Sequence, residues 1–286
     1  MLSVVIPAFN EGQSIFNTVK SVKKILDTAN IVPNEVIVVD DGSADKTGDL
    51  AEAGGAFVIR HPHNLGYGGS LKTGISIAKY DAIVITDSDG TYPIDRIPDL
   101  YSKYKEGFDM VVGSRVGKTY RGSAIKWPMR ILLRFLVEWT AGRKIPDINS
   151  GMRIFSKGKI MTYFPRLCNT FSFTTSATLA YMMNSQFVTY VPIDYAERIG
   201  VTHVRLWRDS LRTFQFILQA VTYYNPLKIF LLLSFFCFSV ALISILIGVI
   251  FHIATAFLMG VAGILGGILI FALGLLADLL RQILSK

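Results

Sequence analysis

The sequence predicts an α/β fold with a mostly parallel central sheet, followed by a C-terminal hairpin of two transmembrane helices. Short β-branched runs alternate with segments of helical periodicity, an order that gives a parallel sheet covered by helices. Two of the runs end in acidic pairs, at the edge where open α/β sheets bind ligands. From Ile229 through Ala277 the chain has no Asp, Glu, Lys or Arg. Such a stretch can hold two spans of about 20 apolar residues each.

The predicted strands are short runs rich in Val and Ile. The main sheet is expected to contain, in chain order, residues 2–7, 35–39, 56–60, 83–86 and 108–113. Helices are expected at residues 15–26, from a Gly-rich turn through about residue 79, and at 94–104. Two further strands are expected as antiparallel additions at the sheet edge, at residues 153–155 and 187–193.

The charge-free stretch predicts two transmembrane spans, at about residues 228–251 and 255–278. Lys228 precedes the stretch, Arg281 and Lys286 follow it, and the link between the spans carries no charge. The positive-inside rule then predicts that both termini and the N-terminal domain face the cytoplasm, at a plasma or endoplasmic-type membrane. The expected parts are a domain of residues 1–195, interfacial helices within 196–227 and the hairpin within 228–280.

Hydrophobic residues make up 51% of the 286 residues, and the mean hydropathy is +0.43. Residues 1–228 contain 27 of the 29 basic and 20 of the 21 acidic residues, a net charge of +7. A basic domain beside a bilayer attracts anionic headgroups or phosphorylated lipids. Nucleic acid is the other partner that such charge allows, and the membrane anchor argues against it. The two cysteines, Cys168 and Cys237, imply no disulfide framework.

Asp87 and Asp89 follow the strand at residues 83–86, and Gly90 and Pro93 then turn the chain away. At i and i+2 the two carboxylates point the same way if the extended backbone continues through them. Carboxylates at this place suit a hard divalent cation, Mg²⁺ or Mn²⁺, that bridges phosphate oxygens. An isolated Asp-x-Asp is otherwise a solvated acidic turn, and the surrounding motifs favour the cation site.

The Gly-rich turn at residues 64–69 opens the helix that runs to about residue 79. It does not fit the G-x-G-x-x-G dinucleotide fingerprint, and it follows the third strand rather than the first. No Walker A sequence is present. A Rossmann dehydrogenase is therefore a poor fit. Taken by itself, the turn is as compatible with a simple helix-opening loop as with a ligand-binding loop.

Two segments combine basic and aromatic residues at helical spacing. Within residues 125–140, Lys126, Arg130 and Arg134 fall on one face, beside an apolar face that carries Trp. Residues 203–212 repeat the pattern shortly before the hairpin. Basic, Trp-bearing amphipathic helices are typical of membrane interfaces, and their cations suit a nearby phosphate. A buried domain helix, or simple anchoring to anionic lipid, is the alternative.

The strand ends and loops carry an ordered set of motifs, at residues 7–11, 40–43, 64–68, 87–89, 113–115 and 149–153. This set resembles that of the family 2 glycosyltransferases with a GT-A fold. Within that family the chain looks most like the polyprenyl-phosphate glycosyltransferases, the group of dolichyl-phosphate mannose synthase. The resemblance covers roughly residues 2–225, and the two-span anchor matches one membrane-bound branch.

This resemblance implies a GT-A nucleotide-sugar-binding domain in which Asp87 and Asp89 bind the metal. Thr91 stands where relatives often have Gln, so water could take its place as a third ligand. Arg115 is expected near the transferred sugar or the phosphates, and with Asp89 it is an expected catalytic residue. The expected donor-binding residues are Pro7, Ala8, Asn10, Glu11, Asp40, Asp41, Gly66, Asp87 and Ser88.

The acceptor is expected to be held by cations, because a lipid phosphate is already an anion and needs no deprotonation. Residues 198–203 resemble the Arg-x-Gly-x-Ser-Lys segment that grips the acceptor phosphate in the family. His203 replaces the Lys, which makes that contact weaker or dependent on pH. The expected acceptor-phosphate residues are Arg130, Arg134, Arg198, Thr202, His203 and Arg205.

These features predict a metal-dependent glycosyltransferase that moves one hexose-type sugar from a UDP- or GDP-linked donor to polyprenyl phosphate at the cytoplasmic membrane face. The resemblance implies that the transfer inverts the sugar configuration. The Gln-x-x-Arg-Trp motif of processive polysaccharide synthases is absent, which counts against polymerisation.

Two other functions stay open. Transfer to a lipid hydroxyl, such as that of a diacylglycerol, would need a general base within hydrogen-bond reach. Asp147 is the one candidate for that catalytic role, although it could instead only position its loop. The chain could also be a non-catalytic membrane adaptor that keeps the fold, against which the intact Asp87, Asp89 and Arg115 argue. A homo-oligomer is compatible with the sequence.

Overall fold

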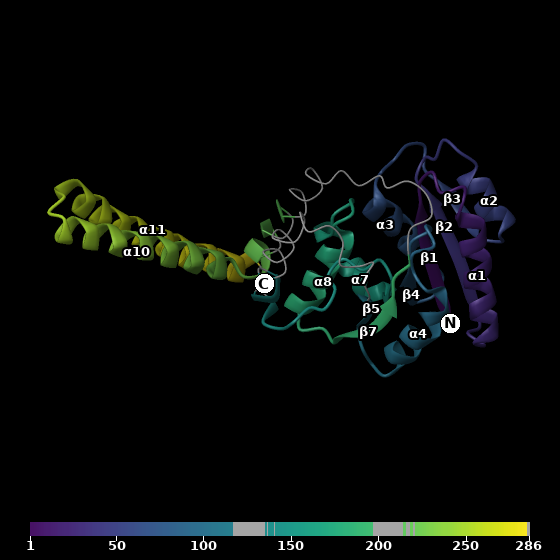
Figure 1. Ribbon diagram of the computed structural model, residues 1–286. Coiled ribbons are helices and arrows are strands. Elements are labelled where there is room, and N and C mark those ends of the chain that lie inside the picture. The colour runs from purple at the N-terminus through teal and green to yellow at the C-terminus, as the bar shows by residue number, and fades with distance from the viewer. Residues whose placement is uncertain are drawn as a thin grey trace. The chain divides into compact units, whose positions relative to one another are not determined.

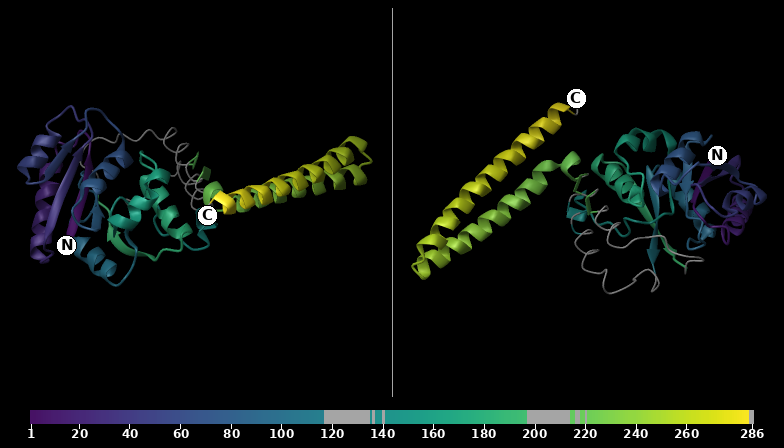
Figure 2. Two further views of the ribbon diagram at one scale, coloured as in Figure 1. Left: turned by 180° about the vertical axis from the view of Figure 1, so that it is seen from behind. Right: turned by 90° about the horizontal axis from the view of Figure 1, so that it is seen from above.

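The computed structural model describes residues 1–116, 135, 137–139, 141–196, 214–215, 218–219 and 221–284. The chain forms two compact units, Met1–Ile217 and Leu218–Lys286 (Figures 1 and 2). The helix predicted at residues 125–140 lies largely outside the described residues, and the one predicted at 203–212 lies wholly outside them.

The first unit is built on a seven-stranded sheet of order β3-β2-β1-β4-β6-β5-β7. Its strands are β1 Leu2–Ala8, β2 Asn34–Asp40, β3 Phe57–Arg60, β4 Ala82–Ile85, β5 Met110–Val116, β6 Arg153–Ser156 and β7 Val188–Asp194. Strands β1 to β4 are parallel neighbours, and β5 pairs in parallel with β7. Strand β6 is antiparallel to both β4 and β5, so the sheet is mixed and mostly parallel, as predicted.

The two late strands correct one prediction. Strand β6 is antiparallel, as expected, but it lies inside the sheet, where Arg153 pairs with Ile85 on one side and Val112 on the other. Strand β7 lies at the edge, as expected, but it runs parallel to β5. The buried run Arg153–Phe155 explains the interior place, because a strand covered on both faces needs no polar side.

Helices cover both faces of the sheet (Figure 1). Helices α1 Ile15–Thr28, α2 Thr47–Ala53 and α4 Ile97–Lys105 lie on one face, and α3 Tyr67–Ile77, α7 Lys157–Tyr163 and α8 Phe173–Met183 lie on the other. The described part of the unit also contains two short 3₁₀ turns, η1 Ile94–Arg96 and η3 Phe164–Arg166. Helix α3 packs closely on β1, since a Cβ on Gly74 would lie 2.4 Å from Val5 Cγ1. This contact fixes the start of α3 near the carboxyl end of the sheet.

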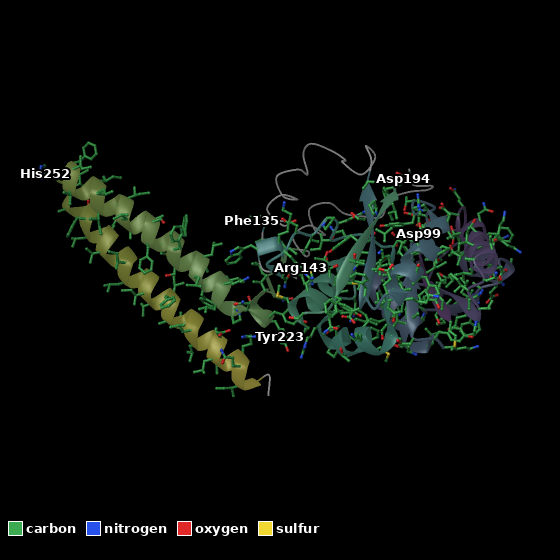
Figure 3. The ribbon with its side chains drawn as sticks, turned by 90° about the horizontal axis from the view of Figure 1, so that it is seen from below. Asp99, Phe135, Arg143, Asp194, Tyr223 and His252 are labelled. Atoms are coloured by element: carbon green, nitrogen blue, oxygen red, sulfur yellow. The ribbon has the colours of Figure 1, made fainter. Side chains whose placement is uncertain are left out.

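The second unit contains two long apolar helices, α10 Pro226–Ile250 and α11 Ala254–Leu284. Both are long and apolar enough to cross a membrane, and little of either is buried within the protein. Glycines of α11 let the helices approach closely: a Cβ on Gly267 would lie 2.7 Å from the Phe238 ring. The Ser234 hydroxyl also donates to the Gly267 carbonyl at 2.8 Å. His252, with a φ of 55°, lies at the turn between the helices (Figure 3).

Candidate active site

The candidate site lies at one edge of the sheet, where the carboxyl ends of β1, β2, β4, β5 and β7 meet the start of β6. This arrangement follows from the strand directions, because β6 alone among these strands runs the opposite way. The described loops that carry predicted site residues all meet the sheet at this edge. The sequence therefore brings residues that are distant along the chain to one place.

The loops after β1 and β2 are bonded to each other. The Asn10 backbone N–H donates to Ser43 Oγ at 2.9 Å, and the Ala44 backbone N–H donates to the Asn10 side-chain oxygen Oδ1 at 2.8 Å. The Glu11 N–H donates to Thr47 Oγ1 at 2.9 Å, and Asp40 Oδ1 accepts from the Ser43 N–H at 3.0 Å. The predicted donor-binding residues of these two loops, Pro7, Ala8, Asn10, Glu11, Asp40 and Asp41, thus lie together.

Asp41 holds the Gly-rich turn. Its buried carboxylate accepts the backbone N–H groups of Leu65 at 2.9 Å and Gly66 at 2.8 Å. His61 Nδ1 lies 2.7 Å from the same carboxylate. Gly66 has a φ of 91°, and a Cβ there would lie 2.6 Å from the Asn169 carbonyl oxygen. Only glycine suits this position, so Asp41 and Gly66 together set the loop that opens α3.

Each carboxylate of the acidic pair is oriented by a hydroxyl. The Tyr67 hydroxyl donates to Asp87 Oδ1 at 2.8 Å. Asp89 Oδ1 accepts from the Thr91 N–H at 3.1 Å and from Thr91 Oγ1 at 2.6 Å. Burial, and then the nearby Asp87 carboxylate, raise the pKa of Tyr67 well above its ordinary value, so this phenol stays a donor at neutral pH. Between the two, the Ser88 carbonyl accepts from Thr18 Oγ1 of α1 at 3.1 Å.

These residues fit a divalent cation that takes much of its coordination from substrate phosphates. The described residues contain no cluster of three or more His, Cys, Asp or Glu that could form an all-protein metal cage. Magnesium in phosphate-transfer sites is typically bound by one or two carboxylates plus phosphate oxygens and water. The Thr91 hydroxyl is buried and turned to Asp89, which makes it an orienting group, and its predicted role as a ligand stays a prediction.

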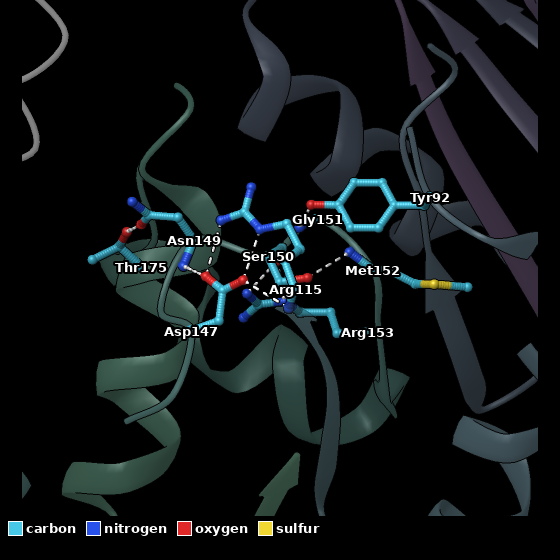
Figure 4. Close-up of polar contacts among 9 residues, drawn as sticks. All are labelled: Tyr92, Arg115, Asp147, Asn149, Ser150, Gly151, Met152, Arg153 and Thr175. Atoms are coloured by element: carbon cyan, nitrogen blue, oxygen red, sulfur yellow. Dashed lines mark hydrogen bonds and ion pairs between the residues drawn. The ribbon is translucent and has the colours of Figure 1, made fainter. Parts of the chain in front are cut away.

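Arg115 and Asp147 form a two-point ion pair at the end of β5 (Figure 4). Arg115 Nε lies 2.7 Å from Asp147 Oδ2, and Nη2 lies 2.9 Å from Oδ1. The backbone N–H groups of Arg115 and Asn149 donate to the same carboxylate at 3.2 and 3.1 Å. The Asp147 side chain is fully buried. A carboxylate has about four acceptor positions, and these donors account for that number.

Sequence reasoning missed Arg153 as a site residue, although it ends one of the motifs. Its fully buried guanidinium donates to the Ser150 carbonyl (Figure 4). Its Nη1 lies 3.0 Å from both the Thr174 carbonyl and Thr178 Oγ1 of α8. The Thr175 hydroxyl meets Asn149 Oδ1 beside it. Arg153 therefore fastens the loop at 147–151 to α8. The pattern Ser150-Gly151-x-Arg153 was the one available signal.

Two tyrosines were missed as well. Tyr67 opens α3 and holds Asp87, and its place in the Gly-rich turn was the signal that could have found it. Tyr92 follows the acidic pair, and its hydroxyl accepts the Gly151 N–H at 2.6 Å. The predicted acceptor-phosphate residues Arg130, Arg134, Arg198, Thr202, His203 and Arg205 all lie outside the described residues.

Comparison with known proteins assigns both parts of the chain. Residues 3–164 match the model of Glycosyl transferase family 2, and residues 225–283 match the GtrB C-terminal hairpin. The apolar helices α10 and α11 are thus a hairpin of a recognised kind, and together with their length they indicate a membrane-anchored protein.

Several curated relatives are similar to the chain over part of its length. The low-salt glycan biosynthesis hexosyltransferase Agl6 of Haloferax volcanii is 30% identical over 76% of this chain and 53% of its own length. The dolichyl-phosphate hexose transferase of the same organism is 28% identical over 70% of this chain and 85% of its own. An undecaprenyl-phosphate 4-deoxy-4-formamido-L-arabinose transferase of Serratia proteamaculans is 28% identical over 61% and 57%. The chain thus spans little more than half the length of two of these relatives.

Among solved structures, the chain is similar to glucosyl-3-phosphoglycerate synthase from Mycobacterium tuberculosis in complex with Mn²⁺, uridine diphosphate and phosphoglyceric acid. The TM-score is 0.64 at 21% identity, over 77% of this chain and 78% of that one. This likeness confirms the predicted GT-A-like α/β fold. With more than half of its residues matched by the family model, the chain belongs to Glycosyl transferase family 2.

Proposed function

We propose that this protein transfers a single sugar from a nucleotide sugar to polyprenyl phosphate at the cytoplasmic face of a membrane, with inversion and with the help of Mg²⁺ or Mn²⁺. The proposal keeps the three parts expected from the sequence, a catalytic domain of residues 1–195, interfacial helices within 196–227 and a hairpin within 228–280. The names of the dolichyl-phosphate and undecaprenyl-phosphate transferases support a polyprenyl-phosphate acceptor. The family match and the hairpin match support sugar transfer beside a membrane.

The burial and hydrogen bonds of Asp147 are the observation that favours one acceptor over the other. A hydroxyl acceptor needs a base that can take up its proton in the transition state. Asp147, the one candidate base, is buried, and its carboxylate oxygens accept hydrogen bonds from Arg115 and from the Asn149 N–H. An acceptor phosphate is already an anion and requires no such base. The geometry therefore favours a phosphate acceptor and a positioning role for Asp147.

In the proposed reaction an oxygen of the acceptor phosphate attacks the anomeric carbon. The bond from that carbon to the nucleotide diphosphate breaks, and the electron pair leaves with the diphosphate. A cation held by Asp87 and Asp89 would neutralise this leaving group as a Lewis acid. Tyr67 and Thr91 orient the two carboxylates, and Arg115 contributes positive charge at the end of β5.

A transfer assay tests the proposal. The full chain, in detergent or nanodiscs, is incubated with polyprenyl phosphate and a panel of labelled UDP- and GDP-sugars. Label is expected to enter the lipid phase from one donor, with Mg²⁺ or Mn²⁺ present, and to stay in the aqueous phase with EDTA. Transfer that survives EDTA would contradict the metal role. Label on dephosphorylated polyprenol or on diacylglycerol would favour the lipid-hydroxyl function instead.

Replacement of Gly151 tests whether the acidic pair needs the close approach of this loop. A Cβ at residue 151 would lie 2.7 Å from Asp87 Oδ1, so Gly151→Ala must displace the carboxylate or the loop. A displacement of about 1 Å at a catalytic centre typically reduces activity about 100-fold, and that is the loss we expect in kcat. Gly158→Ala in α7, where an added Cβ would come no closer than 3.5 Å to another residue, is the control. Wild-type kcat in Gly151→Ala would contradict the placement of Asp87.

A further inference from the structure

We propose that Tyr195 is a positioning residue for sugar transfer, because its ring and the Asp147 carboxylate together hold the Arg115 guanidinium in place. The inference rests on the proposed function and deepens it. Tyr195 follows β7 directly, and Arg115 lies near the end of β5, the strand that pairs with β7. Strand pairing thus brings together two residues that are 80 positions apart in the sequence.

The contact geometry is that of a cation–π pair. Arg115 Cζ lies 5.2 Å from the centre of the Tyr195 ring, within the roughly 6 Å at which such pairs attract. The Arg115 side chain is 14% exposed, so water screens the attraction little. Asp147 meets the same guanidinium through Nε and Nη2. Two hydrogen bonds to Asp147 and an aromatic ring beneath Cζ leave the guanidinium little freedom to turn.

A second ring connects this pair to the acidic loop. The rings of Tyr92 and Tyr195 meet edge to face, with centres 5.3 Å apart and planes at 72°, a preferred aromatic geometry. The Tyr92 hydroxyl accepts the Gly151 N–H at 2.6 Å. The Ala196 N–H donates to the Thr91 carbonyl at 3.0 Å. The segment after β7 is therefore joined to the acidic loop by a hydrogen bond as well as by the ring contact.

These contacts assign a role to Tyr195 that its packing alone would not. The ring also packs against the hydrophobic core, and a merely structural tyrosine would affect stability and nothing else. A positioning tyrosine should act through Arg115, and the strength of its effect should follow the negative charge on the ring face. Its hydroxyl should be dispensable, because neither contact uses it.

The test measures kcat/KM for transfer to polyprenyl phosphate by the full chain. Tyr195→Phe is expected to stay within about twofold of wild type, and Tyr195→Met to lose about tenfold, a typical effect of a desolvated cation–π pair. Phenylalanines with one to four ring fluorines at position 195 keep the ring size and should lower kcat/KM stepwise. In an Arg115→Met background, Tyr195→Met should have less than a twofold further effect. Tyr101→Leu, which removes a ring 5.0 Å from Lys105 Nζ on α4, is the matched control and should leave kcat/KM unchanged.

Three results would overturn the inference: equal kcat/KM across the fluorinated series, wild-type kcat/KM in Tyr195→Met, or an undiminished loss in the Arg115→Met background. The fluorinated series decides the matter even if Tyr195→Met fails to fold. The activity of the wild-type protein distinguishes a failure of the proposed function from a failure of this inference. If the wild type transfers no sugar to polyprenyl phosphate, the proposed function is wrong. If the wild type is active and changes at Tyr195 leave kcat/KM unaltered, only the inference is wrong.

Discussion

Replacing Asp89 with Asn is expected to lower the rate of sugar transfer about a thousandfold while the fold stays intact. An amide has nearly the volume of the carboxylate, and its oxygen can still accept from the Thr91 N–H and hydroxyl. What is lost is the negative charge that would hold the cation against the leaving diphosphate. A metal ion supplies several kcal/mol of such stabilisation, and about 4 kcal/mol corresponds to a thousandfold in rate.

Binding of the nucleoside diphosphate gives a readout that does not depend on turnover. We expect Mn²⁺ to tighten the binding of UDP or GDP, whichever the wild type binds, measured by calorimetry, and to have little effect on Asp89→Asn. Asp95→Asn, an exposed acid six residues further along, controls for the loss of one charge near the site. Unchanged cellular function in Asp89→Asn, despite lost transfer activity, would revive the non-catalytic adaptor hypothesis. Full transfer activity of the purified variant would instead remove the cation from the mechanism.

Much of this fold could be predicted because its early elements carry strong periodicity. Helix α1 buries Ile15, Val19, Val22 and Leu26 at helical spacing, and β1 and β4 are fully buried apolar runs. Helix α8 could not be predicted in the same way. Its residues from Phe173 to Met182 are buried all round, so it has no polar face to mark a period.

The candidate site was predictable as a set of residue types and not as a set of contacts. The acidic pair, the Gly-rich turn and Arg115 could be picked out because each follows a predicted strand. The hydrogen bond from Tyr67 to Asp87 and the ring of Tyr195 against Arg115 join residues 20 and 80 positions apart. Such pairs depend on the order and direction of the strands. The position of β6 decides that order, and the prediction that β6 lies at the edge of the sheet was wrong.

Asp147→Asn is expected to lower the free energy of unfolding by about 3 kcal/mol, because it removes one partner of a buried ion pair. The Arg115 guanidinium, 14% exposed, would then face a neutral amide whose NH₂ group is itself a donor. For a domain of this size the loss corresponds to about 6–12 °C in melting temperature, measurable on the full chain in detergent. Asp99→Asn removes the partner of Arg96 in a pair whose side chains are about half exposed. That control should cost at most about 1 kcal/mol.

Activity of the same variant decides between the two roles of Asp147. If the carboxylate only positions Arg115, the folded variant should lose about tenfold in kcat, and the pH dependence of kcat should keep its shape, because no proton passes through residue 147. A general base contributes about 10²–10⁴-fold, and its loss would also remove the acidic limb of the pH profile. A large loss without destabilisation would therefore assign Asp147 to proton transfer. The acceptor would then be a lipid hydroxyl, since a phosphate acceptor gives a base no proton to take.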